Sequence, residues 1–286
     1  MKFREEKDSM GKLNVPEDAL YGATTQRALL NFPISDLRFN RTFIKSIAEI
    51  KRCAAETNLE LGALEKNIAD EIIKAAELVS KGDYDSEFVV DIFQTGSGTS
   101  TNMNTNEVIS NVAIKNMGGI IGSRDPIHPN DHVNKGQSSN DVVPTAIHIA
   151  GCVGIVESLI PGLEKLQKSL EKKSEEFWGI IKTGRTHLQD ATPIRLGQEF
   201  LGYSGQIEES IRRAKNSLGE LSILALGGTA VGTGIGMQKG FSNKVIEKLS
   251  KRFNIKFSES PNHFHSQSTI DAIVASSGNL KTIAVS

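Results

Sequence analysis

The residues of this sequence that could carry chemistry fall in three polar segments. They are residues 95–106, which begin with Thr95-Gly96-Ser97-Gly98-Thr99, residues 128–140, which end with Gln137-Ser138-Ser139-Asn140, and residues 183–190, which contain Gly184-Arg185-Thr186-His187-Leu188-Gln189-Asp190. Each segment combines hydroxyl, amide or imidazole groups with few bulky apolar side chains. Hydroxyl and amide groups donate hydrogen bonds to the oxygens of small anions, and a histidine can transfer a proton near neutral pH. The sequence therefore contains candidates for an anion site and for an acid–base group.

In the first segment, residues 96–99 precede apolar residues at helical spacing between residues 108 and 114. At a helix N-terminus the unpaired backbone N–H groups and the helix dipole favour an anion. Ser97, Gly98 and Thr99 are therefore candidate ligands for a carboxylate or a phosphate. The alternative is that the hydroxyl groups only cap the helix while the glycines relieve a tight turn. The segment lacks the Lys-Ser/Thr pair of a phosphate-binding loop.

The second segment also stands at a predicted helix start. Ser138 and Asp141 have the spacing of a capping box, and an ordinary cap explains the segment when it is taken alone. The same residue types recur at other helix starts of this chain, which favours Ser138, Ser139 and Asn140 as further anion ligands. A polar helical turn at residues 102–107 fits a solvated helix face and a site equally well.

His128-Pro129-Asn130-Asp131-His132 has two readings. A metal site would need further ligands at helical or loop spacing, and no carboxylate pair completes an i, i+4 set with these histidines. The segment is more typical of a turn that can bind an anion. We therefore expect no metal site.

The third segment places His187 between the hydroxyl of Thr186 and the carboxylate of Asp190. Such neighbours can tune the proton affinity of an imidazole, so His187 is a candidate general acid or base. The alternative is a loop histidine with a structural role or none.

The elements that must position these segments are mainly helical. Residues 1–38 are rich in Gly and Pro and predict an irregular arm with short strands at most. Helical periodicity, caps and stops predict helices over residues 40–61, 68–82, 99–118, 138–170 with a bend at Pro161, 193–224, 243–253 and 266–286. The pattern predicts a mainly α protein with an amino-terminal, mainly helical domain over residues 1–138 and an incomplete central helical bundle domain over residues 139–286.

Composition narrows the class of protein. The 286 residues include 33 Lys and Arg and 34 Asp and Glu, so nothing points to a nucleic-acid tail or an anionic membrane surface as a partner. Cys53 and Cys152 lie in apolar segments without metal-ligand spacing, which is typical of reduced core cysteines. The charged N-terminus and the lack of any run of about 18 apolar residues favour a cytoplasmic protein.

Seven motifs, in this order, give the chain a resemblance to a known family. They are Gly96-Ser97-Gly98-Thr99, Asn102-Met103-Asn104-Thr105-Asn106-Glu107, His128-Pro129-Asn130-Asp131, Val133-Asn134-Lys135, Gln137-Ser138-Ser139-Asn140-Asp141, Gly184-Arg185-Thr186-His187-Leu188-Gln189-Asp190 and Gly227-Gly228-Thr229-Ala230-Val231-Gly232-Thr233-Gly234. The chain resembles the fumarase/aspartase superfamily over essentially its whole length. It is most similar to the amino-terminal portion of the class II fumarases, because aspartases carry glutamine at the position of His187 and Ser-Thr-Asn in place of Ser138-Ser139-Asn140.

The resemblance implies a fold, an activity and partners. The fold would be a mixed amino-terminal domain followed by part of a long-helix bundle. The activity would be that of a fumarate hydratase, which reversibly hydrates fumarate to (S)-malate in the tricarboxylic acid cycle without a metal or organic cofactor. Family members are homotetramers whose active sites each draw on three subunits. The implied partners are a small dicarboxylate and sister subunits.

The resemblance also implies roles for individual residues. His187 would be catalytic and would activate the water that becomes the hydroxyl of malate. The residues implied to hold the substrate carboxylates are Ser97, Gly98, Thr99, Ser138, Ser139, Asn140 and Thr186. The residues implied to form the family's second dicarboxylate site are His128, Pro129, Asn130 and Asp131.

One family feature does not occur in these 286 residues. It is the mobile loop Gly-Ser-Ser-x-Met-Pro-x-Lys-x-Asn, whose serine is assigned as the proton-abstracting base. We therefore expect a chain truncated before the catalytic serine loop and inactive by itself. Two alternatives stay open: an aspartate ammonia-lyase-like enzyme, and a catalytically inactive fragment that binds dicarboxylates.

Overall fold

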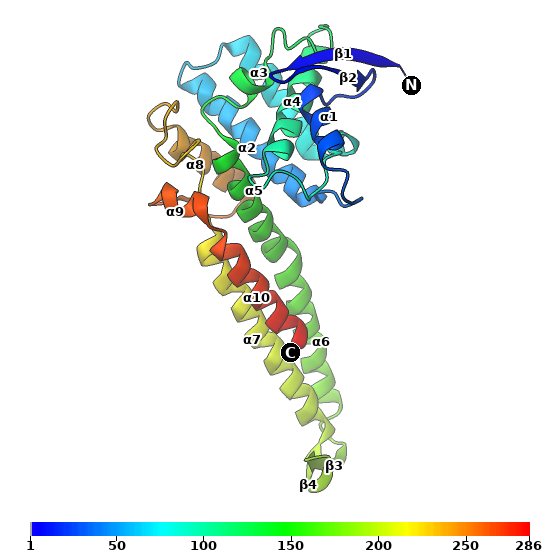
Figure 1. Ribbon diagram of the computed structural model, residues 1–286. Coiled ribbons are helices and arrows are strands. Elements are labelled where there is room, and N and C mark those ends of the chain that lie inside the picture. Colours follow the sequence, from blue (N-terminus) through cyan, green and yellow to red (C-terminus); the bar gives the residue numbers. More distant parts are fainter. Residues whose placement is uncertain (1) are drawn as a thin grey trace. The chain divides into compact units, whose positions relative to one another are not determined.

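The computed structural model describes residues 2–286, which form two units (Figure 1). The first unit comprises the residues up to 150 together with residues 222–270, and the second comprises residues 151–221 and 271–286. Helices dominate both units, which confirms the predicted mainly α class. The predicted domain boundary at residue 138 stays a prediction.

The helices of the first unit surround an apolar core. They are α1 Ala23–Asn31, α2 Arg41–Glu60, α3 Lys66–Lys81, the short 3-10 helix η1 Asp85–Glu87, α4 Thr99–Asn116, the π-helical turn η2 Pro129–Val133, α5 Ser139–Gly154 up to residue 150, α8 Phe241–Phe253 and α9 His263–Ser268. Ile47, Ile72 and Ile109 have no exposed surface, and each lies on the apolar face of its helix. Two helix ends predicted from the sequence are confirmed. The side chain of Asn40 caps the start of α2, and Gly82 ends α3 with a φ of +102°.

Helix α1 lies within the arm that the sequence predicts to be irregular. Its N-terminus is held by the carboxylate of Glu107 on α4, which accepts hydrogen bonds from the backbone N–H groups of Gly22, Thr24 and Thr25 at 2.9–3.0 Å. The carboxylate also accepts the hydroxyl proton of Thr25 at 2.7 Å. An anion at a helix N-terminus stabilises the helix, and here it comes from more than 80 residues further along the chain.

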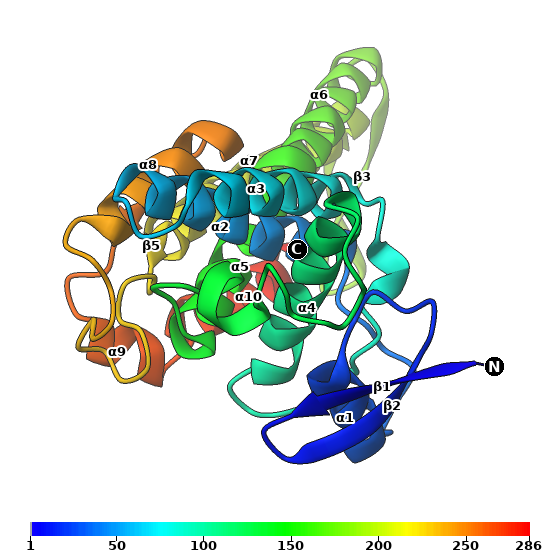
Figure 2. The same cartoon turned by 90° about the horizontal axis from the view of Figure 1, so that it is seen from above.

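Short strands and α8 complete the first unit. Strand β1 Phe3–Asp8 pairs antiparallel with β2 Gly11–Pro16, and β5 Ile223–Leu224 pairs parallel with β6 Ser258–Glu259. Figure 2 shows α8 beside α2, where Lys248 on α8 forms an ion pair with Glu60 on α2 at 2.6 Å.

The second unit is a bundle of long helices. Its helical elements are η3 Ile155–Leu159, α6 Ile160–Glu176, α7 Leu196–Leu221 and α10 Asp271–Val285. Helices α6 and α7 lie side by side, and α10 packs against α7 (Figure 1). Asn279 on α10 donates a hydrogen bond to the hydroxyl of Ser217 on α7 at 2.9 Å. The predicted long-helix bundle is present in part, as expected from the 3.6-residue periodicity.

A β-hairpin joins α6 to α7, where the sequence predicts a loop and a helix beginning at Pro193. Strand β3 Ile181–Thr186 pairs antiparallel with β4 Gln189–Arg195, and Pro193 lies in β4 opposite Thr183. Helix α7 therefore begins three residues later than predicted, at Leu196. A proline is tolerated in an edge strand because its missing N–H need not join a ladder.

Just before Pro161, where the sequence predicts a bend, the structure has the π-helical turn η3, which directly precedes α6. Proline cannot donate a backbone hydrogen bond and its ring crowds the preceding turn, so the helix widens there. The helical stretch Ser139–Glu176 is long and apolar enough, by length and composition, to cross a membrane, although core helices of soluble proteins pass the same test.

The last predicted helix, over residues 266–286, is divided in the structure. Helix α9 ends at Ser268, Thr269 is extended, and α10 begins at Asp271. The side chain of Asn262 caps α9 by accepting from the N–H of His265 at 3.2 Å. This cap starts a short helix earlier than the sequence pattern indicates.

Candidate active site

The segment Gly96-Ser97-Gly98-Thr99 forms the turn that leads into α4. Gly98 has a φ of +70°, and a Cβ atom added to it would lie 2.7 Å from Cγ1 of Val143 on α5. Only glycine fits this backbone conformation so close to a neighbouring side chain. Gly98 therefore allows the turn to approach the start of α5.

The hydroxyl groups of Ser97 and Thr99 do not cap α4. The backbone N–H of Ser100 donates to Oγ1 of Thr95 at 3.2 Å, and that of Thr101 donates to Oε1 of Gln94 at 2.9 Å. The hydroxyls of Ser97 and Thr99 lie 2.8 Å from each other. The simple capping alternative is thus wrong for these two hydroxyls, because Gln94 and Thr95 supply the cap.

The segment Ser138-Ser139-Asn140 lies at the start of α5, where the side chains of Ser138 and Asp141 accept backbone N–H groups. Asp141 Oδ1 accepts the backbone N–H of Ser138 at 2.9 Å, and Oγ of Ser138 accepts that of Asn140 at 3.2 Å. Ser139 Oγ accepts a hydrogen bond from Nδ2 of Asn102 at 2.9 Å. The capping reading therefore holds for Ser138, whereas Ser139 contacts the polar face of α4.

Asp141 also ties the glycine-rich turn after β5 to the start of α5. Its Oδ2 atom accepts the N–H groups of Gly227 at 3.2 Å and Thr229 at 2.9 Å. The carboxylate is fully buried, and this burial raises its pKa while the backbone donors oppose the rise. Asn140 reaches the same turn by donating to the carbonyl of Ala230 at 2.7 Å.

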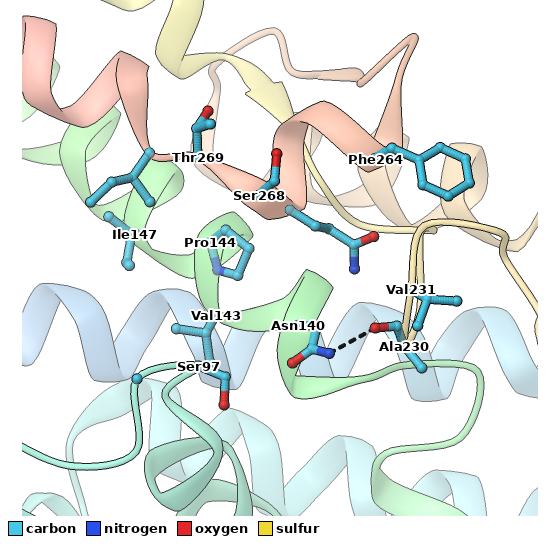
Figure 3. A pocket seen from close by; sticks show the side chains of 13 residues that line it. Ser97, Asn140, Val143, Pro144, Ile147, Ala230, Val231, Phe264, Ser268 and Thr269 are labelled. Atoms are coloured by element: carbon cyan, nitrogen blue, oxygen red, sulfur yellow. Dashed lines mark hydrogen bonds between the residues drawn. The ribbon is translucent and has the colours of Figure 1, made fainter.

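A cavity of about 490 Å³ opens in the first unit between these segments. Figure 3 shows Ser97 and Asn140 on its wall, with Phe264 and Thr269 across the opening. The full lining is Gly96, Ser97, Asn140, Val143, Pro144, Ile147, Ala230, Val231, Phe264, Gln267, Ser268, Thr269 and Ile270. The cavity joins hydroxyl and amide groups to an apolar wall, a combination suited to a small anion with a short carbon chain.

Gln267 is a lining residue that the sequence analysis missed. Its Nε2 donates to the carbonyl of Thr229 at 2.6 Å, while its Oε1 is buried without a hydrogen-bond partner among residues 2–286. It lies in a segment that reads as an ordinary helix, so no local pattern distinguishes it.

His128 organises the turn η2. The Nδ1 atom of His128 accepts hydrogen bonds from the backbone N–H groups of Asn130 at 3.3 Å and Asp131 at 3.1 Å. The backbone N–H of His128 donates to Nδ1 of His132 at 2.9 Å. Burial lowers the pKa of His132. Pro129 is buried, and the side chains of Asn130 and Asp131 are exposed. The turn is thus internally bonded, and a second dicarboxylate site here stays a prediction.

Thr186 and His187 belong to the second unit and are not part of the group around the cavity. His187 and Leu188 form the two-residue turn of the β3–β4 hairpin, with φ angles of +51° and +62°. Such turns favour Asn and Gly, and other residues cost about 1–3 kcal/mol each there. Backbone strain like that at His187 and Leu188 often accompanies function. Beside the turn, Asp190 forms an ion pair with Arg185 at 3.4 Å.

The comparisons with known proteins agree with this architecture. A protein-family model described as "Lyase" matches residues 11–286, and the chain belongs to this lyase family. The chain is 51% identical over 271 residues to the class II fumarate hydratase of Halobacterium salinarum, which covers 95% of this chain and 57% of that protein. It is 50% identical over 286 residues to the mitochondrial fumarate hydratase of Danio rerio, covering 99% of this chain and 56% of that protein.

A solved structure is equally similar in fold. The recombinant class II fumarase from Schistosoma mansoni superposes with a TM-score of 0.96 at 39% identity, over 99% of this chain and 63% of that chain. The resemblance to class II fumarases is therefore confirmed. The chain spans between 56% and 63% of the length of these three relatives.

Proposed function

We propose that this chain supplies the dicarboxylate-binding part of a fumarate hydratase. The observation that carries the proposal is that Gln94 and Thr95 cap α4, so that the hydroxyls of Ser97 and Thr99, which bond to each other, are not used in the cap. Ser139 and Asn140 add a hydroxyl and an amide from the N-terminus of α5. Hydroxyl donors at a helix N-terminus are well placed to bind a carboxylate.

The reaction needs such donors. Removing the proton beside a carboxylate of malate places a second negative charge on that end of the substrate, and loss of the hydroxyl as water then gives fumarate. Fixed hydroxyl, amide and backbone N–H donors aimed at this charge lower the barrier without a metal. His187 would hold and activate the water in the hydration direction, acting as a general base.

The complete site would be assembled in a homotetramer. Thr186 and His187 on the β3–β4 hairpin would meet the Ser97–Thr99 and Ser138–Asn140 segments of a sister subunit, and the turn at residues 128–131 would form the second dicarboxylate site. The names of the relatives support a fumarate hydratase of the tricarboxylic acid cycle. A cytoplasmic location is proposed from the sequence alone. No nucleic acid or membrane partner is proposed.

Binding of malate to the purified 286-residue chain, followed by calorimetry, tests the proposal. We expect binding that weakens about tenfold or more in Thr99→Val, because hydrogen bonds to charged groups contribute about 1.5–3 kcal/mol. Ser169→Ala is the matched control, since this hydroxyl is exposed on α6 and donates to the carbonyl of Lys165. Absence of malate binding by the unmodified chain contradicts the proposal.

An activity assay separates the alternatives. Loss of the ultraviolet absorbance of fumarate in water alone indicates hydration, and loss only with added ammonia indicates an aspartate ammonia-lyase-like enzyme. Malate binding with neither reaction is the outcome expected when these 286 residues supply the dicarboxylate-binding part alone.

A further inference from the structure

Helix α2 carries a lysine in the core of the first unit. Lys51 has no exposed surface, and its Nζ bonds to Oδ1 of Asn134 at 2.7 Å and Oε1 of Gln137 at 3.0 Å. Both partners are neutral amide oxygens. Burying an ammonium without a contacting carboxylate is unfavourable, so the hydrogen bonds to these two amides must offset part of the cost. The partners of Lys51 lie in the segment that leads into α5.

The lysine fixes which way the two amide groups point. An ammonium has only donors, so it bonds to the oxygen of a side-chain amide and not to its NH₂ group. The oxygens of Asn134 and Gln137 must therefore face Lys51, and their NH₂ groups face away. Nδ2 of Asn134 donates to the carbonyl of Gln137 at 3.3 Å, and Nε2 of Gln137 donates to the carbonyl of Val133 at 3.2 Å.

The orientation of Asn134 is passed to α4 and then to α5. Oδ1 of Asn134 also accepts from Nδ2 of Asn102 at 3.3 Å, and the same Nδ2 donates to Oγ of Ser139 at 2.9 Å. Asn102 is fully buried, and its Oδ1 has no hydrogen-bond partner among residues 2–286. The NH₂ group of Asn102 thus donates to two acceptors, Oδ1 of Asn134 and Oγ of Ser139. The hydroxyl of Ser139 therefore acts as an acceptor towards α4.

A serine hydroxyl that accepts from the protein interior keeps its own proton for a partner outside. We propose that Lys51 is a positioning residue which, through Asn134 and Asn102, holds Ser139 as a hydrogen-bond donor to a carboxylate of the substrate. This inference rests on the proposed function, because the ligand is the dicarboxylate named there. We call the series of hydrogen bonds that connects Lys51, Asn134, Asn102 and Ser139 the amide relay.

A double-mutant cycle on malate affinity tests the amide relay. Lys51→Met leaves the amides free to turn, so we expect the dissociation constant to rise about tenfold, and Ser139→Ala should raise it by a similar factor. In the Ser139→Ala background Lys51→Met should have no further effect. Lys45→Met is the matched control, because Lys45 lies on the same helix beside the ring of Phe253.

Two further measurements keep the test decisive. The side-chain amide NMR signals of Asn102 and Asn134, recorded without ligand, should shift in Lys51→Met and stay in place in Lys45→Met. If Lys51→Met does not fold, Asn134→Asp and Asn134→Leu serve instead. Both variants lose the donor to the carbonyl of Gln137, but the carboxylate of Asp still accepts from Lys51 and Asn102. Affinity should therefore stay within about threefold in Asn134→Asp and fall about tenfold in Asn134→Leu.

The outcomes distinguish the two proposals. If the unmodified chain binds no malate, the proposed function fails and the assignment of Ser139 fails with it. If the unmodified chain binds malate and Lys51→Met binds it equally well, or if the losses from Lys51→Met and Ser139→Ala simply add, the amide relay is wrong while the proposed function stands. Unchanged amide signals of Asn102 also overturn the relay.

Discussion

Lys51 and Asp141 are buried ionisable residues of the first unit, and burial shifts their pKa values in opposite directions. Burial raises the pKa of the Asp141 carboxyl, although N–H groups of Ser138, Thr229 and Gly227 oppose the rise. Burial lowers the pKa of the Lys51 amine to about 7, although the negative charge of Asp141 opposes the fall. The first unit therefore contains an amine that changes charge near neutral pH.

The lowered pKa of Lys51 makes stability depend on pH. The unfolded lysine has an ordinary pKa of about 10.4, so between about pH 7 and that value the unfolded chain binds more protons than the folded chain. The free energy of unfolding should therefore rise with pH across this window, because the penalty for burying the ammonium is complete only below about pH 7. We expect the free energy of unfolding of the unmodified chain, minus that of Lys51→Met, to increase by about 2 kcal/mol from about pH 7 to about pH 9. Urea unfolding at the two pH values measures this difference. A constant or shrinking difference would contradict the lowered pKa.

At the scale of the elements, the helix N-termini of the first unit are held by side chains from different sources. Gln94 and Thr95 cap α4 from the adjacent turn, and Asp141 and Ser138 cap α5 locally. Helix α1 depends instead on Glu107, which lies on another helix. The position of α1 is therefore tied to the packing of α4, and the arm should be the element most sensitive to this one carboxylate.

Replacing Glu107 with Gln should loosen α1. The variant keeps one acceptor oxygen in place of two, loses the negative charge at the helix N-terminus and turns an NH₂ group towards backbone donors. We expect the unfolding free energy to fall by about 2–3 kcal/mol. Urea unfolding measures the loss, and hydrogen exchange should become faster in α1. Glu247→Gln is the control, since Glu247 forms an exposed ion pair with Lys251 on α8, and the variant should unfold at the same urea concentration as the unmodified chain.

The sequence predicts elements well where the signals are local and poorly where they are distant. The ends of α2 and α3 follow from Asn40 and Gly82, which act within one turn of the helix. Helix α1 and the start of α7 depend on Glu107 and on strand pairing of Pro193, and neither contact can be read from neighbouring residues.

The candidate site shows the same division. Local spacing identifies the polar segments at the starts of α4 and α5, but it does not show that Gln94 rather than Ser97 serves the cap. Lys51 could have been noticed, because it stands on the same helical face as Ile47 and Ala54, where a charge is unusual. Its partners Asn134 and Gln137 lie more than 80 residues away and emerge only from the fold.

At the scale of the whole molecule, the second unit exposes apolar side chains along its helices. Leu201 on α7 is 52% exposed, Val274 on α10 is 62% exposed and Leu280 on α10 is 43% exposed. Large apolar side chains that are exposed on bundle helices are typical of surfaces that pack against further helices. The homotetramer proposed for the complete site would cover these residues with helices of sister subunits.

Placing a charge among these exposed apolar side chains should weaken self-association. Burying an unpaired carboxylate between helices costs several kcal/mol, so Val274→Glu should raise the dissociation constant of the assembly at least about 100-fold. Glutamate is a good helix former, so α10 should keep its helical structure, which circular dichroism can check. Sedimentation equilibrium measures the change. Ile34→Glu is the matched control, because Ile34 is 63% exposed but lies in the arm of the first unit. An equal effect of the two variants, or an unchanged mass distribution for Val274→Glu, would show that the α10 face is not the assembly surface.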